Sequence, residues 1–392
     1  AEWLRLEKKA DELRRLTIQT AIWGGSGHLG GAMSAMDAMT ILYHRFMKID
    51  VNNPNLPDRD RFVLSKGHAA VGYAPVICDY GFMPIDELKI FNLTGAKIGM
   101  HLDCNKVRGM DCSTGSLGHG LSLAVGFALA GRVNGIDYMN YVLTGDGELN
   151  EGSNWEAAMS AAQFKLSNVV VLADVNKCMI DGRVDDEMKV EPVDKKFESF
   201  GFNVKRVDGH NFKELNDAIE WAIENHKNGG DKPTAIVMDT FKGEGVDFMK
   251  DNYLWHYGSL DEEKTAQAYA SLDKYYKERC DRAYTMTDTT KLSTAECYGI
   301  ALCELGEEHK DVVALTADLA KSTKIGMFGE KFPDRFFNVG IAEQNLFGVA
   351  AGMAKNGLIP FASTFAIFAS ARSLDQVHTD ICYQNVPVKI IA

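Results

Sequence analysis

The chain of 392 residues contains no CxxC pair, no long apolar run and little proline. Its eight cysteines show no spacing typical of a metal-binding module, and a chain of this length needs no disulfide framework. We therefore expect reduced thiols in a cytoplasmic protein. Because neither a basic leader nor an apolar stretch of about 20 residues is present, we predict no signal peptide and no membrane span. Positive charge is also scarce, and the net charge of −12 argues against nucleic acids and membranes as partners.

Apolar runs alternate with helical patterns in the first part of the chain. Hydrophobic residues make up 46% of the sequence, enough for two or three domains with real cores. Four short apolar runs are predicted to be buried strands, at 140–144, 169–173, 203–207 and 234–238. Helical patterns separate them at 151–165, 194–200 and 212–227. This alternation predicts an α/β fold of the doubly wound type, with helices on both faces of a parallel sheet.

A second α/β unit follows a polar, helical segment at 258–285. Strands are predicted at 312–316, 335–339 and 388–391, with a helix at 342–355. The sequence stops at the last of these strands, so we expect this second parallel-sheet domain to be incomplete. The predicted domains are 1–265 and 291–392, joined by a linker or junction at 266–290. Met286-Thr-Asp-Thr-Thr is equally typical of a fused N-terminus and of a surface linker, and both interpretations stay open.

The strongest chemical signal is Gly145-Asp146-Gly147, followed thirty residues later by Asn176. Each lies directly after a predicted strand, where open α/β sheets bind their ligands. A carboxylate, an amide oxygen and a backbone carbonyl suit a hard cation such as Mg²⁺ or Ca²⁺, and a diphosphate would supply further oxygens. A lone GDG is a common turn, but the spacing and strand context of both members favour a metal and diphosphate site.

This pattern resembles the thiamine-diphosphate motif of the transketolase family, and the chain resembles the family's split-subunit type. Further segments resemble the family in the same order along nearly the whole chain, which makes the set more specific than any one motif. They are Gly25–Gly31, Leu64–Ala69, Met100-His101, Ser113–Gly118, Met179–Gly182, Lys242–Val246, Trp255-His256, Thr316–Leu319, Gly340–Asn345 and Thr364–Phe368.

The resemblance implies a first domain that binds the diphosphate and a second that binds the pyrimidine of thiamine diphosphate. Asp146, Asn176 and the carbonyl of Cys178 would hold the cation. The other residues implied in cofactor binding are Gly115, Leu117, Gly147, Ile180, Asp318, Phe365 and Phe368.

The resemblance also implies a catalytic set and a reaction. Glu343 would hydrogen-bond the pyrimidine, while His28, His68, His101 and His256 would face the substrates. The reaction would transfer a two-carbon ketol unit from a ketose (phosphate) donor to an aldose acceptor through a thiamine-diphosphate carbanion. The family's sugar-phosphate groups lie beyond the segments resembled, so a homodimer or a hetero-oligomer with a separate C-terminal chain is expected.

Other interpretations remain for these residues and for the chain. A single histidine is usually structural, and two phenylalanines at helical spacing are usually core. Leu29, His119 and Ala371 depart from residues common in the family. The chain as a whole could be a partial, non-catalytic subunit or an enzyme like the deoxyxylulose-phosphate synthases, although the histidine set and the segment 242–256 favour a transketolase.

Overall fold

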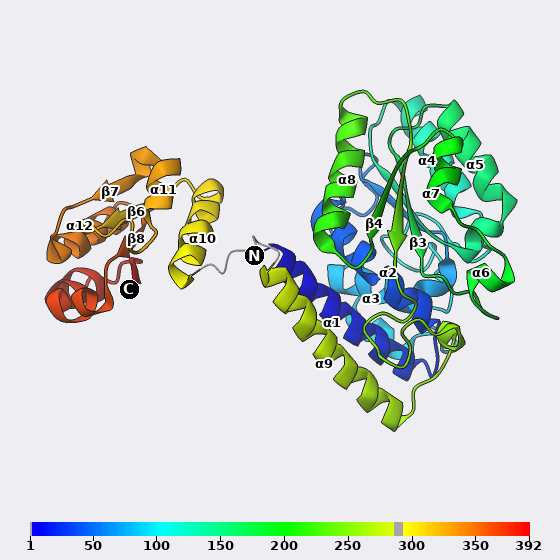
Figure 1. The fold of residues 1–392 in the computed structure, drawn as a ribbon, viewed down its shortest axis with the longest axis horizontal. Helices are drawn as coiled ribbons and strands as arrows, with labels where there is room; N and C mark the ends of the chain where they lie inside the picture. The colour runs from blue at the N-terminus through cyan, green and yellow to red at the C-terminus, as the bar shows by residue number, and fades with distance from the viewer. Residues whose placement is uncertain (1, 286–292) are drawn as a thin grey trace. The chain divides into compact units, whose positions relative to one another are not determined.

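The computed structural model describes residues 2–285 and 293–392. The chain forms two units, Glu2–Tyr284 and Thr285–Ala392, each built around its own parallel sheet (Figure 1). The segment Met286–Thr290, which the sequence marks as a possible junction, lies outside the described residues. Among the residues described, no helix is long and apolar enough to cross a membrane.

The sheet of the first unit has five parallel strands in the order β1-β2-β3-β5-β4. The four predicted strands are present, and an additional strand, β1, lies at the edge beside β2. The strands are β1 (Arg61–Leu64), β2 (Asn140–Gly145), β3 (Val169–Val175), β4 (Asn203–Asp208) and β5 (Thr234–Asp239).

Helices cover both faces of this sheet because successive side chains of a strand point to opposite faces. Tyr141 and Leu143 of β2 pack into one core, while Val142 packs into the other. This arrangement confirms the doubly wound α/β prediction. The first core includes α1 (Glu2–Trp23), α2 (Leu29–Ile41), α3 (Ala70–Tyr80), α8 (Phe212–Lys227) and α9 (Glu262–Thr285); the second includes α4 (Gly120–Asn134), α5 (Gly152–Gln163), α6 (Val184–Glu187) and α7 (Val193–Ser199).

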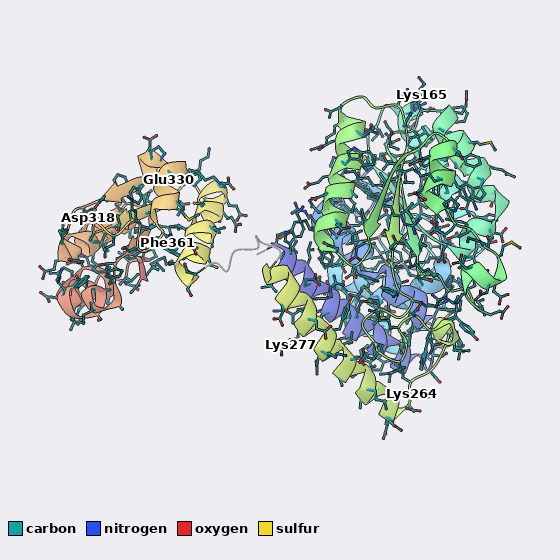
Figure 2. The ribbon with its side chains drawn as sticks, viewed as in Figure 1. Lys165, Lys264, Lys277, Asp318, Glu330 and Phe361 are labelled. Atoms are coloured by element: carbon teal, nitrogen blue, oxygen red, sulfur yellow. The ribbon has the colours of Figure 1, made fainter. Side chains whose placement is uncertain are left out.

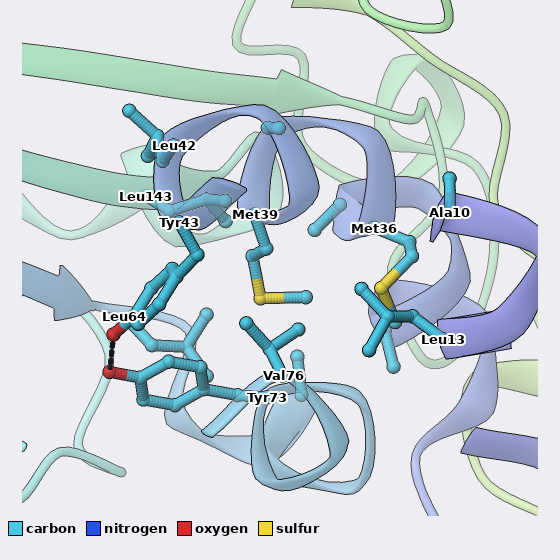
Figure 3. Close-up of a cluster of buried hydrophobic side chains, with 14 of the residues drawn as sticks. Ala10, Leu13, Met36, Met39, Leu42, Tyr43, Leu64, Tyr73, Val76 and Leu143 are labelled. Carbon is cyan, nitrogen blue, oxygen red and sulfur yellow. Dashed lines mark hydrogen bonds between the residues drawn. The ribbon is translucent and has the colours of Figure 1, made fainter. Parts of the chain in front are cut away.

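The first core includes α2 and α3, and a histidine lies just before the start of each of these helices. Figure 3 shows Met39 of α2 facing Val76 of α3, beside a pair of tyrosines, and Met36 beside Leu13 of α1. The hydroxyls of Tyr43 and Tyr73 lie 2.5 Å apart, so each buried phenol has a hydrogen-bond partner. His28 directly precedes α2, and His68 lies in the 3₁₀ turn η2 (Gly67–Ala69) that leads into α3.

Helix α9 belongs to the first unit and runs antiparallel to α1 (Figure 1). Leu272 packs in the core, and the buried Arg279 bonds Glu7 of α1 and, at 2.9 Å, Asp37 of α2. A guanidinium at this depth is stable only when it is paired and hydrogen-bonded. The first unit thus continues to Tyr284, past the predicted domain end at 265. Although the sequence of α9 is mostly polar, one side of this helix is buried against α1.

The second unit has a four-stranded parallel sheet in the order β7-β6-β8-β9. Val313 and Leu315 of β6 pack on one face, and Val312 and Ala314 pack on the other. The strand β8, absent from the sequence prediction, carries Phe361, labelled in Figure 2. The elements are α10 (Thr294–Glu308), β6 (Val312–Thr316), α11 (Gly326–Lys331), β7 (Phe336–Asn338), α12 (Glu343–Lys355), β8 (Ile359–Ser363), α13 (Leu374–Gln376) and β9 (Lys389–Ile391).

Candidate active site

A cavity of about 350 Å³ opens in the first unit, at the carboxyl ends of β2 and β3. Most of the residues predicted for this domain line it, although they come from distant parts of the chain. His101 lies beside the cavity, with its ring centroid 6.3 Å from that of His28. The predicted residues that line the cavity are His28, His68, Gly115, Leu117, Asp146, Gly147, Asn176, Cys178, Ile180 and His256.

Asp146 connects the ends of two neighbouring strands. Its Oδ1 accepts a hydrogen bond from the amide of Gly147 at 2.8 Å, and its Oδ2 accepts one from the amide of Lys177 at 2.5 Å. The amide nitrogen of Asn176 donates to Ser34 at 3.2 Å and to Asp174 at 3.3 Å, which turns the amide oxygen to the opposite side. Two of the predicted cation ligands are therefore held by the backbone or by buried polar groups.

The charge balance at this point suits a bound cation. Burial, and then the negative charge of Asp174, raise the pKa of Asp146 to about 7. A cation beside this carboxylate would offset that cost. The described residues contain no cluster of three His, Cys, Asp or Glu side chains able to hold a metal. Asp146, Asn176 and the Cys178 carbonyl carry oxygen atoms, the kind of ligand that a hard cation prefers.

Two buried lysines line the cavity although the sequence interpretation did not single them out. Lys66 forms a buried ion pair with Asp174, whose carboxylate also accepts a hydrogen bond from Ser34 at 2.6 Å. Lys242 donates to the carbonyl of Cys178 at 3.1 Å, and burial lowers the pKa of Lys242 to about 8. Both lie within segments that resemble the family, but only the fold brings the two side chains to one cavity.

Glu148 is a second group that the sequence interpretation missed. One carboxylate oxygen accepts from Ser65 and from the amide of Gly118 at 2.9 Å, and the other accepts from the amide of Gly145 at 3.0 Å. Burial raises the pKa of Glu148 despite these bonds. The carboxylate thus fixes the loop at Gly118, which has a φ of +89°, against the ends of β1 and β2.

Four histidines form a cluster at the cavity. The ring centroid of His28 lies 5.3 Å from that of His68 and 5.4 Å from that of His256, and the latter two rings stack at 5.0 Å. Gly115 lies against His101, because a Cβ on this glycine would come within 3.0 Å of the ring. The fold therefore brings together four side chains that are up to 228 positions apart in the sequence (256 − 28 = 228).

The partly buried imidazoles of His28, His68 and His256 are neutral over the physiological range. Burial is the largest cause in each case: it lowers the pKa of His28 to about 4, of His68 to about 2 and of His256 to about 3. Lys242, which has only protons to donate, lies 2.9 Å from Nδ1 of His256, so the proton of that ring is on Nε2. Nδ1 of His28 lies 3.3 Å from the sulfur of Met100, a weak acceptor, which leaves Nε2 of His28 as an acceptor.

In the second unit, Glu343 begins α12 and its side chain is buried. Arg372 donates to Glu343 Oε2 at 2.8 Å, and its guanidinium lies 4.2 Å from the ring centroid of Phe368. Burial raises the pKa of Glu343, but the hydrogen bond from Arg372, a bond from its own backbone amide and the charge of Arg372 together hold the pKa below its ordinary value of 4.5. The rings of Phe365 and Phe368 lie 6.1 Å apart. The sequence interpretation did not include Arg372.

Asp318, labelled in Figure 2, follows β6 and adopts a φ of +61°. Its amide donates to the side chain of Asn338 at 3.0 Å, which ties it to the end of β7. Glu343 and Phe365 follow β7 and β8, so all three predicted residues lie at the carboxyl edge of one parallel sheet. Within the described residues, no hydrogen bond or ion pair is present between Asp318 and either Glu343 or Arg372.

The doubly wound fold, with a cavity at the carboxyl ends of its strands, defines an α/β protein of the class that binds ligands at this edge of the sheet. The family described as transketolase, thiamine diphosphate binding domain, matches residues 6–284, and the transketolase pyrimidine binding domain matches residues 290–392. The chain belongs to the transketolase family, as the ordered motifs predicted.

Known relatives differ in how much of their length the chain covers. The 6-deoxy-6-sulfo-D-fructose transketolase subunit SqwG of a Clostridium species is 39% identical to this chain over 269 residues. The aligned region covers 69% of this chain and 96% of SqwG. Rat transketolase is 35% identical over 95% of this chain, which spans 62% of the rat enzyme. The solved transketolase of Campylobacter jejuni has a TM-score of 0.62 and 25% identity, with 98% of this chain and 68% of that chain covered.

Proposed function

We propose that this chain binds thiamine diphosphate with a divalent cation and takes part in the transfer of a two-carbon ketol unit from a ketose (phosphate) to an aldose. The observation that carries this proposal is the convergence of an oxygen ligand set, two lysines and three histidines on one cavity of about 350 Å³, with His101 beside it. Membership of the transketolase family supports it.

The first unit would hold the diphosphate and the cation. Asp146, Asn176 and the carbonyl of Cys178 are the proposed ligands of Mg²⁺ or Ca²⁺. Lys242 and the backbone at Gly147 are positioned for the phosphate oxygens, since both line the cavity. The proposed neighbours of the cofactor rings are Gly115, Leu117 and Ile180. When bound, thiamine diphosphate supplies the electron sink that breaks a carbon–carbon bond beside a carbonyl.

The histidines would bind the sugar and move its protons. Nε2 of His28 is an acceptor and Nε2 of His256 is a donor, a pair that suits hydroxyl groups, which both donate and accept. His68 and His101 complete this polar wall. Because the rings of His28, His68 and His256 are neutral, they would bind hydroxyl groups by hydrogen bonds and would not attract phosphate by charge.

The second unit would bind the pyrimidine part of the cofactor. Glu343, ionised beside Arg372, is the proposed hydrogen-bond acceptor for a ring nitrogen, and Phe365 and Phe368 are the proposed ring neighbours. Asp318, at the same sheet edge, is proposed to contact the cofactor from β6.

A specific observation favours an assembly with a separate chain. Two relatives carry the name of a transketolase subunit, SqwG and an apulose-4-phosphate transketolase subunit from Actinobacillus succinogenes, and they are matched over 96% and 90% of their length. We therefore propose either a homodimer or a hetero-oligomer with a C-terminal subunit. We also propose a cytoplasmic location, the compartment in which thiols stay reduced.

Calorimetric titration of the full chain with thiamine diphosphate, with and without Mg²⁺, tests this proposal. Metal-dependent binding by the wild type that is lost in Asp146→Ala would support it. Glu343→Ala should still bind but fail to activate the cofactor for proton exchange. Absence of binding by the wild type, both alone and together with a separate C-terminal chain, would contradict the proposal.

A further inference from the structure

Two segments far apart in the sequence are joined at the histidine cluster by a short backbone bridge. The amide of Gly27 donates to the carbonyl of Gly258 at 3.0 Å, and the amide of Gly258 donates back to Gly27 at 3.1 Å. His28 follows one of these glycines, and His256 precedes the other by two residues. The bridge therefore sets the distance between two of the cavity's histidines.

Both glycines are closely surrounded, so the bridge has little freedom. A Cβ on Gly27 would come within 3.0 Å of Val71, and one on Gly258 within 3.1 Å of the ring of Trp255. Contacts at this distance would force a neighbour to move. The backbone pairing is thus fixed from the interior side by Val71 and Trp255.

Ser26 and Tyr257 close the bridge on the solvent side. The Ser26 hydroxyl lies 2.6 Å from the hydroxyl of Tyr257, directly across the glycine pair. The ring of Tyr257 lies 4.9 Å from the ring of His28, centroid to centroid, and the tyrosine is 49% exposed. Neither residue belongs to the cofactor and substrate groups assigned above. We call this hydroxyl pair with its ring the Ser26–Tyr257 clasp.

We propose that Ser26 and Tyr257 are positioning residues that hold the imidazole of His28 in one orientation and so determine how a hydroxylated sugar chain enters the cavity. This inference rests on the function proposed above. Met100 contacts one ring nitrogen of His28 at 3.3 Å, and the tyrosine ring covers another side. With the ring held in this way, Nε2 is presented at a fixed place.

The chemistry of the clasp selects hydroxyl groups over charged groups. Both of its members are uncharged, and after their mutual hydrogen bond one hydroxyl hydrogen and several lone pairs remain for a ligand. The exposed ring also offers an apolar face to the carbon–hydrogen side of a sugar. A ketose with hydroxyl groups beyond its carbonyl should therefore depend on the clasp, whereas a donor without them should not.

The test uses the full chain with Tyr257→Phe, Ser26→Ala and the double variant. Tyr257→Phe keeps the ring and removes only the hydrogen bond. Tyr253→Phe, on the same turn, is the matched control, because no hydrogen bond of its hydroxyl is present within the described chain. The ¹⁵N resonances of the histidine rings are recorded without cofactor, and KM is measured for fructose 6-phosphate and for hydroxypyruvate, which lacks the hydroxylated chain.

We expect both single variants to shift the His28 resonances and to raise KM for fructose 6-phosphate about fivefold, the effect of one hydrogen bond. The double variant should equal the singles, since one bond is lost in each case. KM for hydroxypyruvate and the affinity for thiamine diphosphate should remain at wild-type values, as should every property of Tyr253→Phe.

Unchanged His28 resonances in both single variants would overturn the proposal. So would shifted resonances with equal changes in KM for both donors, because the clasp would then act on the fold and not on the sugar. Failure of the wild type to bind thiamine diphosphate would instead contradict the function proposed above, and the His28 resonances would still decide whether the clasp positions that ring.

Discussion

The two units carry their functional groups in opposite ways. The first unit surrounds its groups: Asp146 and Lys242 are almost completely buried at the bottom of a cavity. The second unit presents its groups on an open surface, where Phe365 is 44% exposed and Ile341 is 79% exposed. Glu343 is the exception, since it is buried and yet paired with the half-exposed Arg372.

This difference predicts which unit determines the affinity for the ligand and which unit adjusts the pKa of a side chain. Buried charges interact strongly because water does not screen them, so removal of one should abolish binding. An exposed ion pair contributes little, and its loss should alter a pKa more than an affinity. We therefore expect large effects on cofactor affinity from substitutions in the first unit and small effects on affinity from those in the second.

The largest effect on cofactor affinity is expected from Asp146→Ala, which removes the one carboxylate in the proposed cation site. Affinity for thiamine diphosphate with Mg²⁺ should fall about 100-fold or more, which corresponds to ~2.7 kcal/mol. Calorimetric titration measures this loss. Asp185→Ala, an exposed carboxylate on α6, is the matched control and should bind as the wild type does. Equal affinities for wild type and Asp146→Ala would remove the contrast between the units.

Glu343→Gln should separate binding from activation. The amide keeps the shape of the side chain but cannot carry the negative charge that stabilises a protonated ring nitrogen. Exchange of the reactive cofactor proton with deuterium should slow by about 10²–10⁴-fold, the range of acid–base catalysis. The dissociation constant for thiamine diphosphate should change less than twofold. It can be measured by titration in the same NMR samples. If Glu343→Gln lost as much affinity as Asp146→Ala, both units would contribute equally to cofactor binding, which would contradict the contrast between them.

Mild acid should destabilise the first unit before the second. The folded pKa values of His28, His68 and His256, at about 4, 2 and 3, lie below the value of about 6.5 expected in an unfolded chain. Below pH 6.5 the unfolded chain binds protons that the folded unit does not, so stability falls with pH. Asp146 acts in the opposite sense, because its folded pKa of about 7 exceeds 3.8, and it offsets only part of this loss.

Urea unfolding at pH 7 and pH 5 measures this difference. The tryptophans report the first unit alone, since they are Trp3, Trp23, Trp155, Trp221 and Trp255. Their unfolding midpoint should fall at pH 5, and His68→Gln should weaken the dependence on pH. Glu343 has a lowered pKa, so the second unit loses its contribution only as the pH falls below about 4.5. A tryptophan midpoint that is the same at both pH values would contradict the assignment of neutral buried histidines.

The smallest effect is expected from Arg372→Gln. Without the guanidinium, burial dominates and the pKa of Glu343 should rise, which ¹³C NMR of the carboxyl group can follow. Because Arg372 is 48% exposed, its removal should cost less than about 1 kcal/mol of stability. Arg372→Lys should restore much of the charge effect but not the flat contact with Phe368. A fall in the pKa of Glu343 would mean that another group controls this carboxylate.

The regular part of the fold was predictable because its local signals agree with its tertiary environment. The runs at 140–144 and 234–238 are apolar throughout, as strands buried on both faces require. The strand β1, Arg61–Leu64, escaped prediction because it has four residues and begins with arginine. The end of the first unit was not predicted either, because the sequence of α9 is mostly polar. Only the bonds of Arg279 to Glu7 and Asp37, on two other helices, show that α9 belongs to the first unit.

The sequence by itself determined the family, the two α/β units and the residues that follow each strand. Ordered motifs carry this information, because the strand ends must place the same residue types wherever the same ligand is bound. Only the tertiary structure decided which of these residues share a cavity and in what protonation state. Lys66 with Asp174, Arg372 with Glu343 and the clasp of Ser26 with Tyr257 each join segments that no local pattern connects. Burial, which sets their pKa values and the strength of their bonds, is a property of the folded chain alone.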